Sequence, residues 1–371
     1  MRPQNASSAP AFYSPQLDGL RFLAALSVYI HHGPMVDWGP MRLVHTNGWL
    51  GVDLFLCISA FLLTTLLRLE YESTGTINIG HFLLRRGLRI WPLYLTFSSL
   101  MCLLAWLWWK MPGRLVAAWW LSHVSFTNNV MASLRGFSTI PCTGHLWTIS
   151  LEEQIYFVLP FFLLSIFASK TLRRSGLQSA LILIVILLLA RSGLYLYDAP
   201  LSFICVLPLR ADSFITGFIA ALIVHDAGPW QRWLERPWLL LGGGLALLSS
   251  ALFFPVINSQ TTYQIFGYLL IALGCGLLLL ASQSPAVARS PLASRPMRYL
   301  GKISYGLYVF HFIGLTIGTA VARRLGTENA ALVLLLGFGF TLVLSALSYR
   351  ILEKPFLRLK ERFSRVASRP T

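Results

Sequence analysis

The sequence predicts an all-α integral membrane protein, a polytopic helical bundle of about ten transmembrane helices. Hydrophobic residues make up 56% of the 371-residue chain and charged residues only 12%, whereas a soluble domain has roughly 25% charged residues. The mean hydropathy is +0.64. Apolar runs recur from residue 17 to residue 350 with no long polar stretch between them. One integral domain therefore accounts for the chain better than several soluble domains do.

The spans follow from the lengths of the apolar runs, since a helix needs roughly 20 mainly apolar residues to cross the hydrocarbon core. The first segment, 1–16, is polar and Pro-rich, and no small-residue cleavage site follows the first apolar run. The first helix is therefore expected to be retained and not removed as a signal peptide. A membrane domain is predicted over 17–353, followed by a basic tail over 354–371. The ten predicted spans cover residues 17–36, 48–68, 88–109, 146–168, 177–197, 203–223, 237–255, 263–282, 299–320 and 331–350.

Two features between and within these spans add no further element. The aromatic stretch "RLVAAWWLSHVSF" between the third and fourth spans is too short to count as a span, and we interpret it as an interfacial or re-entrant piece. The five cysteines are scattered singly. Such spacing provides neither a zinc site nor a disulfide framework, so no metal is expected.

Lys and Arg residues predict the orientation of the bundle, because they are enriched in cytoplasmic loops. If the N-terminus is cytoplasmic, most of the basic residues lie inside, including the tail "EKPFLRLKERFSRVASRP". Both termini are thus expected in the cytoplasm and the protein in the inner membrane. The asymmetry explains the net charge of +16 without nucleic acid as a partner. The tail is a basic amphipathic run that is expected to rest against anionic lipid headgroups. Other inner clusters contain Arg85, Arg86, Arg89, Lys170, Arg173 and Arg174.

Ionisable residues inside the spans indicate where function should be sought, because each costs roughly 2.5 to 3.5 kcal/mol on insertion. Asp18 and Arg21 are expected near the cytoplasmic end of the first span and His32 toward its outer third. The second and fourth spans start on the outer side, so their ionisable residues are expected at a depth similar to that of His32. These residues are Asp53, His145, Glu152 and Glu153, and later spans add Arg191, Arg210, Asp212 and His311.

A histidine that meets a carboxylate in such a layer favours general base catalysis, because the imidazole is basic enough near neutral pH and the carboxylate orients its tautomer. This chemistry suits the removal of a proton from an attacking hydroxyl. Glu152 and Glu153 are about 100° apart on a helix, so they cannot share one face.

Structural interpretations stand beside the functional ones. Asp18 and Arg21 have the spacing of an i,i+3 ion pair that would fix the entrance of the helix. The arginine cluster before the third span offers forked donors for a phosphate, but the charges alone favour simple anchoring at the membrane surface. Lone histidines at helix ends are commonly interfacial or satisfied core groups, which is the interpretation for His31, His45, His123 and His225.

Six segments, in order, resemble the acyltransferase 3 family of membrane proteins, which move acetyl or other short acyl groups from coenzyme A to sugars, glycans and some small metabolites. The segments are "LDGLRFLAALSVYIHHG", "GWLGVDLFLCISAFLL", "FLLRRGLRIWPLYL", "HLWTISLEEQIYFVLP", "YLGKISYGLYVFHF" and "LEKPF". The resemblance covers nearly the whole chain and implies ten spans. Where the family usually has Ser-Gly-Phe in the second span, this chain has Ser59-Ala60-Phe61, which predicts a slightly less close helix approach there.

The resemblance also implies roles for individual residues. The family's arginine and required histidine, with ten residues between them, correspond to Arg21 and His32. Its two arginines three apart, thought to engage the coenzyme phosphates, correspond to Arg86 and Arg89. Its acidic pair falls on Glu152 and Glu153, of which we favour Glu153.

We therefore expect an inner-membrane O-acyltransferase that moves an acetyl or other short acyl group from acetyl-CoA, or another acyl-CoA, to a hydroxyl of a sugar or glycan such as O-antigen or exopolysaccharide. Direct transfer and an acyl-enzyme relay both remain open. The chain ends without an appended extracytoplasmic domain, from which we expect an arrangement other than the family's two-domain peptidoglycan-modifying one. The alternatives are a transporter or flippase for a glycan precursor or anionic solute, and a structural partner in glycan assembly.

Each candidate residue receives one expected role in this account. The catalytic candidates are His32, Glu153, Asp18 and Asp53. The donor-binding candidates are Arg21, Arg86, Arg89 and Arg85, and the acceptor-binding candidates are Glu152, His145, Arg210 and His311.

Overall fold

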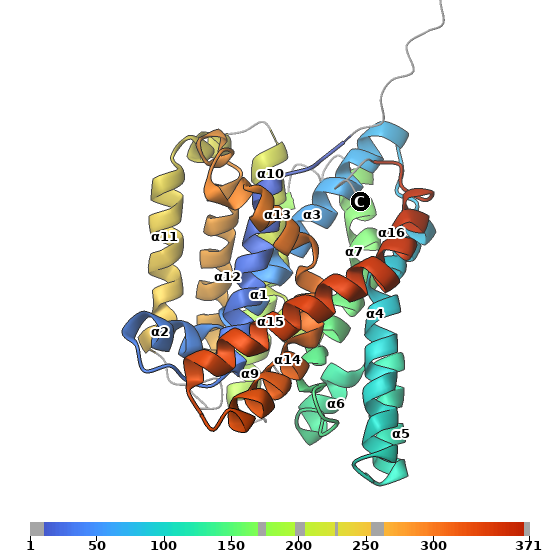
Figure 1. The fold of residues 1–371 in the computed structure, drawn as a ribbon. Coiled ribbons are helices and arrows are strands. Elements are labelled where there is room, and N and C mark those ends of the chain that lie inside the picture. The colour runs from blue at the N-terminus through green and yellow to red at the C-terminus, as the bar shows by residue number, and fades with distance from the viewer. Residues whose placement is uncertain (1–10, 170–175, 197–204, 227–228, 254–262, 367–371) are drawn as a thin grey trace, which may run out of the picture.

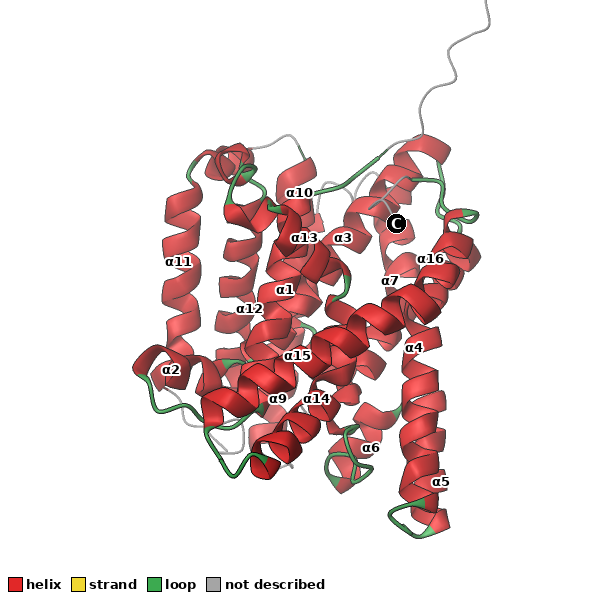
Figure 2. Cartoon of the chain, in the orientation of Figure 1, coloured by secondary structure: helices red, strands yellow, loops and turns green. Residues whose placement is uncertain are grey.

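A computed structural model describes residues 11–169, 176–196, 205–226, 229–253 and 263–366, and these residues form a bundle of helices joined by short loops (Figures 1 and 2). The predicted all-helical fold is confirmed. The basic residues Lys170, Arg173 and Arg174, and most of the predicted N-terminal segment 1–16, lie outside the described residues. The α-helices are α1 (Pro15–His32), α2 (Gly39–Asn47), α3 (Leu50–Thr74), α4 (Ile79–Leu107), α5 (Gly113–Val124), α6 (Asn128–Arg135), α7 (Trp147–Ala168), α9 (Gly176–Leu196), α10 (Asp212–His225), α11 (Pro237–Ser249), α12 (Tyr263–Ser282), α13 (Arg295–Lys302), α14 (Ser304–Arg324), α15 (Ala330–Ser348) and α16 (Lys354–Glu361).

Seven helical segments in the described part of the chain are long and apolar enough to cross a membrane. They contain α3, α4, α7, α9, α12, α14 and the continuous run from α15 to α16. Helices also occupy the other three predicted spans, but α10 and α11 have only 14 and 13 residues. The third, α1, has 18 residues and carries Asp18 and Arg21. A multi-pass membrane bundle is therefore established, whereas the number of ten spans is not.

The helix ends follow local sequence signals. Helix α1 starts at Pro15, whose fixed backbone angle suits the first turn. Helix α3 ends at Gly75, which has a φ of 73° that side chains with a Cβ rarely adopt. Asn78 then caps α4 by accepting a hydrogen bond from the backbone N–H of His81 at 2.9 Å. The turn from α3 to α4 is thus fixed by Gly75 and Asn78.

Helix α3 is central, because it packs against α1, α7, α10 and α12. Its contact with α10 is close at Gly217, where a Cβ would lie 2.2 Å from the carbonyl oxygen of Cys57. The same position would bring that Cβ to 2.8 Å from the Cβ of Ala60, so Gly217 lets α10 approach α3 closely at Ala60. Figure 1 shows α11 beside α12 at the edge of the bundle, away from the cavity described below.

The last helices form one long run that crosses the front of the bundle obliquely in Figure 1. Helix α15 pairs with α14, and a π-helical turn, Tyr349–Glu353, joins it to α16. Helix α16 packs on α4. The short aromatic stretch predicted as interfacial or re-entrant forms α5, which packs on the end of α4.

Candidate active site

Helix α1 carries polar side chains at two levels, as predicted, and the two levels have different surroundings. Asp18 and Arg21 line a cavity, whereas His32 stands at the other end of the helix and is absent from the cavity wall. His32 comes eleven positions after Arg21, which corresponds to about 16 Å along a helix. The side chains on α1 thus belong to two sites, a cavity and a histidine cluster.

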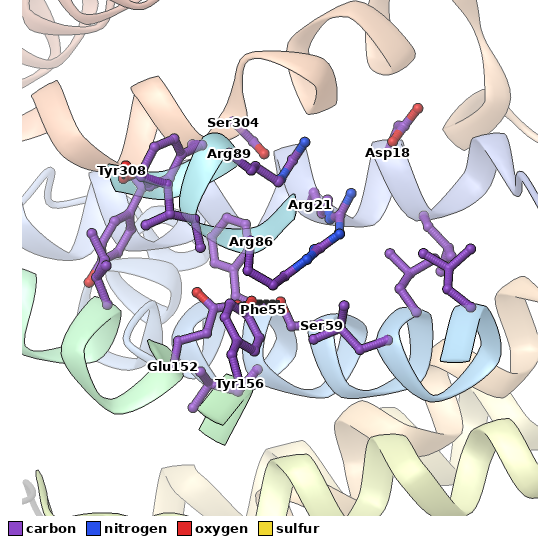
Figure 3. Close-up of a pocket in the computed structure, with 18 of the residues that line it drawn as sticks. Asp18, Arg21, Phe55, Ser59, Arg86, Arg89, Glu152, Tyr156, Ser304 and Tyr308 are labelled. Carbon is purple, nitrogen blue, oxygen red and sulfur yellow. Dashed lines mark hydrogen bonds between the residues drawn. The ribbon is translucent and has the colours of Figure 1, made fainter. Parts of the chain in front are cut away.

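The cavity lies between α1, α3, α4, α7, α14 and α16, and Figure 3 shows it in close-up. It contains about 1230 Å³ of empty space, including its open mouth. On α3 its lining extends from Val52 to Leu66, which is about 21 Å at the rise of a helix. The cavity is therefore elongated along α3.

Arginines from two helices converge on this cavity, and Figure 3 shows Arg21, Arg86 and Arg89 directed into the same space. Arg86 and Arg89 are three residues apart on α4 and share a face. Within the described residues no ion pair or hydrogen bond joins either of them to a carboxylate, and the Nε of Arg86 is buried without a partner. Lys360 of α16 also reaches the lining. These cations make the cavity a good site for an anion.

Arg85, the neighbour of Arg86, has a different position from the one predicted. Its Nη2 donates to Glu70 Oε2 at 2.8 Å, and its Nη1 donates to the carbonyl oxygen of Phe363 at 2.8 Å. Arg85 does not line the main cavity. Its ion pair with Glu70 and its bond to Phe363 tie α3 and the C-terminal segment to α4.

The structure separates the two adjacent carboxylates of α7. Glu152 lines the cavity, and it accepts hydrogen bonds from Ser59 Oγ at 2.5 Å and from the Tyr156 hydroxyl. Glu153 lies on another face and accepts from Trp91 Nε1 at 2.9 Å. Glu153 therefore does not lie beside His32, contrary to the prediction, and Glu152 is the member of the pair that faces the cavity.

A cluster of three histidines lies beyond the end of the cavity that Tyr308 and Thr148 line. The ring centroid of His311 is 4.9 Å from that of His32 and 4.5 Å from that of His145. His32 Nδ1 donates to the carbonyl oxygen of Val28 at 3.0 Å, so the neutral ring carries its lone pair on Nε2. His311 Nδ1 donates in the same way to the carbonyl oxygen of Tyr308 at 2.6 Å. His32 is exposed, while the other two rings are buried.

Two hydroxyl groups separate the cavity from the histidines. Tyr308 and Thr148 line the cavity, and their oxygens are 2.6 Å apart. The Tyr308 hydroxyl also donates to the carbonyl oxygen of His145 at 2.8 Å, and the Tyr308 ring contacts the rings of His145 and His311. Tyr308 and Thr148 thus form a thin partition between the arginine-lined cavity and the histidine cluster.

Asp53 and Arg210 belong to neither site, in contrast to the prediction. Arg210 Nη2 donates to Asp53 Oδ2 at 2.7 Å, and Ser213 Oγ donates to Asp53 Oδ1 at 2.8 Å. The Arg210 guanidinium also lies over the ring of Tyr268, 3.8 Å from its centroid. All these side chains are buried. Asp53 and Arg210 therefore join α3 to the start of α10, as Arg191 and Asp212 join α9 to α10.

The prediction that several carboxylates lie beside His32 at one depth of the bundle is consequently wrong. Within the described residues no hydrogen bond or ion pair joins His32 to a carboxylate. Among the described residues, the aromatic rings in contact with the His32 ring are those of His311, Phe312 and His31. The described residues also hold no group of three or more His, Cys, Asp and Glu side chains arranged for a metal ion.

The histidines interpreted as structural do make local bonds. His31 Nδ1 donates to the carbonyl oxygen of His45 at 2.7 Å, and His45 Nε2 donates to that of Gly33 at 3.0 Å. His225 is hydrogen-bonded to Thr65, and His123 to Tyr94 and Asn128. The bonds of His31 and His45 stabilise the connection between the end of α1 and α2.

Sequence reasoning missed several lining residues. Ser59 and Tyr156 carry no charge and gave no signal. Tyr308 precedes His311 by one helical turn in the motif "SYGLYVFHF", which could have placed the two together. Lys360 shares a helix face with Leu357, a pattern that we assigned to lipid contact.

Comparison with known proteins adds independent information. A family model described as an acyltransferase domain matches residues 14–350. The chain is 25% identical over 361 residues to the peptidoglycan O-acetyltransferase OatA of Listeria monocytogenes. The aligned region covers 92% of this chain and 56% of that protein. A Staphylococcus aureus protein, provisionally named an O-acetyltransferase, is 26% identical over 360 residues, with 93% of this chain and 57% of that protein covered.

The Bacillus subtilis protein YrhL, provisionally named a peptidoglycan O-acetyltransferase, is 25% identical over 357 residues, with 92% of this chain and 55% of that protein covered. The chain thus spans little more than half the length of these curated relatives. No solved structure shows a significant match.

Proposed function

Because the chain belongs to the acyltransferase 3 family, as its motifs predicted, we propose that it is an integral-membrane O-acyltransferase that moves an acetyl or other short acyl group from acyl-CoA to a hydroxyl of a sugar or glycan. One observation carries this proposal. An elongated cavity lined by Arg86, Arg89 and Lys360 ends, at Tyr308 and Thr148, against a cluster that contains His32. This arrangement suits a long anionic donor whose reactive end must meet a base.

The donor would place its phosphates on Arg86 and Arg89, whose guanidinium forks match phosphate oxygens. Its thioester arm would extend along α3, past Ser59 and toward Val52. The apolar lining from α3, which includes Phe55 and Leu56, suits the carbon chain of such an arm. Acetyl-CoA is the donor that we propose.

His32 would act as the general base. Nε2 of His32 would take the proton of the acceptor hydroxyl while the hydroxyl oxygen bonds to the acyl carbon and the carbon–sulfur bond breaks. The proton would then pass to the departing thiolate, which leaves as the free thiol. His311 and His145 would surround the imidazolium that forms in between, a neutral environment in place of a carboxylate.

The hydroxyl pair of Tyr308 and Thr148 separates the donor cavity from His32 in this structure. The proposal therefore requires that this pair part when the donor binds. Small movements of this kind are a common way for an enzyme to admit a reactive group only when the site is filled.

The acceptor would reach His32 from the side opposite the donor. Because the Listeria relative is named a peptidoglycan O-acetyltransferase, a glycan is the acceptor class that we propose, and peptidoglycan, O-antigen and exopolysaccharide are members of that class. The distribution of basic residues supports cytoplasmic termini and therefore donor binding from the cytoplasm, with the protein in the inner membrane.

A transfer assay tests the proposal against the transporter alternative. Detergent-purified protein would receive acetyl-CoA with a labelled acetyl group and a mixed glycan extract. An acyltransferase moves the label to the glycan and releases free thiol. A transporter leaves acetyl-CoA intact, and that result would contradict the proposal.

A further inference from the structure

Helix α16 is held firmly against the donor cavity. Besides the packing of α16 on α4, Arg85 Nη1 donates to the carbonyl oxygen of Phe363, just past the end of α16. The Phe363 ring also meets His81 edge-on, with centroids 5.6 Å apart. The segment after the last predicted span is therefore fixed to the protein and does not only rest on lipid.

One face of α16 points inward. Leu357 and Lys360 are buried, with Lys360 only 7% exposed, whereas Arg358 and Arg362 are exposed. Within the described residues no hydrogen bond or ion pair holds the Lys360 ammonium. Burying an ammonium without an anionic partner is unfavourable, so this side chain is suited to a ligand that brings negative charge.

Lys360 lines two adjoining cavities. One is the donor cavity, and the other is a smaller space of about 360 Å³, including its open mouth. Both cavities share Leu63, Leu66, Arg86 and Lys360, and the smaller one adds Glu70, Phe82, Arg85, Ser364 and Val366. The wall between them thus consists of two cations and two leucines.

The charges around Lys360 are mostly of the same sign. Arg85, Arg86 and Arg89 all act electrostatically on Lys360, and all three are cationic. Glu70 already compensates Arg85, and Glu361 is on the exposed face. A group with two negative charges, such as a phosphate monoester, would offset this repulsion better than a single carboxylate would.

We propose that Lys360 is a donor-binding residue and that α16 forms one wall of the donor site, with Lys360 and Arg86 holding a phosphate of the donor where the two cavities join. The proposal rests on the acyl-CoA donor of the proposed function. The smaller cavity would receive the nucleotide end of the donor, while the acyl arm extends the other way toward Tyr308. This role replaces the lipid contact expected for this part of the tail.

Binding of coenzyme A to the full-length protein in neutral detergent tests this proposal. We expect Lys360→Gln to weaken binding about tenfold, the usual effect of losing one charge-assisted hydrogen bond. Lys360→Arg should bind within about threefold of the wild type because it keeps the charge. Arg358→Gln, which removes the same charge from the exposed face of α16, should bind as the wild type does.

The outcomes separate this proposal from the proposed function. If the wild type binds coenzyme A and Lys360→Gln binds equally well, Lys360 has no role in donor binding, while the proposed function stands. If the wild type binds no coenzyme A, the donor assignment itself fails, and this inference fails with it.

A lipid phosphate has the same chemistry as a donor phosphate, so a second arm distinguishes these sources. Native mass spectrometry would count phosphatidylglycerol molecules retained by the wild type and by Lys360→Gln. Equal retention together with weakened coenzyme A binding supports the donor. Loss of retained phosphatidylglycerol with unchanged coenzyme A binding would overturn the proposal in favour of a lipid site.

Discussion

His32 at the end of α1 and His311 in α14 hold their imidazole rings with centroids 4.9 Å apart and planes tilted by 38°, although the two residues lie far apart in the sequence. Each ring donates its Nδ1 proton to a carbonyl oxygen of its own helix, so each presents an unprotonated Nε2. When His32 takes up a proton, a neighbouring neutral imidazole can share the charge. In the proposed mechanism His311 and His145, and not a carboxylate, would lie beside the protonated ring.

Substitution of His311 tests this role. We expect His311→Phe, which keeps a ring in place, to lower kcat about tenfold and to leave KM for the donor unchanged, because His311 acts through His32. His311→Gln offers a polar acceptor and should retain more activity. A His311→Phe variant that changes only the KM for the donor would instead place His311 in donor binding.

Replacement of Arg86 or Arg89 by glutamine should raise KM for acetyl-CoA about tenfold each, since each change removes one charge-assisted contact with phosphate. The effect on donor binding should shrink as ionic strength increases. Arg324→Gln is the matched control, because Arg324 is exposed at the far end of α14. Equal effects of the cavity variants and of Arg324→Gln would indicate a general loss of charge and not a donor site.

Glu152→Gln and Glu153→Gln form a matched pair on α7. Glu152 faces the cations of the cavity and bonds Ser59 and Tyr156, so Glu152→Gln should change the KM for the donor severalfold. Glu153→Gln disturbs one hydrogen bond with Trp91 and should cost about 1 kcal/mol of stability or less with little change in turnover. Steady-state kinetics of both variants would check this. A larger loss of turnover in Glu153→Gln would show that Glu153 is the functional carboxylate, as the sequence analysis favoured.

Asp53 and Arg210 should matter for folding and not for chemistry. Removal of one partner leaves a buried charge uncompensated, so Asp53→Asn is expected to destabilise the protein by about 3 to 5 kcal/mol. The double variant Asp53→Asn with Arg210→Met removes both charges and should recover much of that loss. Thermal unfolding in detergent measures this. If Asp53→Asn is as stable as the wild type but has lost turnover, Asp53 has a catalytic role and this account of it is wrong.

The helices could be predicted from the sequence because the membrane sets both their length and their composition. The runs that became α3, α4, α7 and α14 are apolar over a full span, and the structure has helices there. The number of spans could not be settled, because α10 and α11 are shorter than a span although the sequence around them is apolar.

The site could be predicted only in part. The family resemblance singled out Arg86 and Arg89, and both line the cavity, because residues three apart on a helix share a face. Which of Glu152 and Glu153 faces the cavity depends on how α7 is rotated in the bundle, and no local pattern gives that angle. The partner of Asp53 is Arg210, and sequence spacing does not reveal a pair between two distant helices.

The tail illustrates the same limit. An amphipathic helix shows that one face will be covered, but it does not show what will cover it. The structure covers the Lys360 face of α16 with α4 and the cavity wall, where the sequence suggested lipid.

The measurement that tests the account most directly combines donor binding with single-turnover release of thiol in His32→Ala and in the wild type. The account predicts that His32→Ala binds acetyl-CoA with unchanged affinity, since His32 does not line the donor cavity, and that its turnover falls by a factor of about 10² to 10⁴. Wild-type turnover in His32→Ala would contradict His32 as the base. A matching loss of binding and turnover would show that His32 holds the donor and does not act on the acceptor hydroxyl.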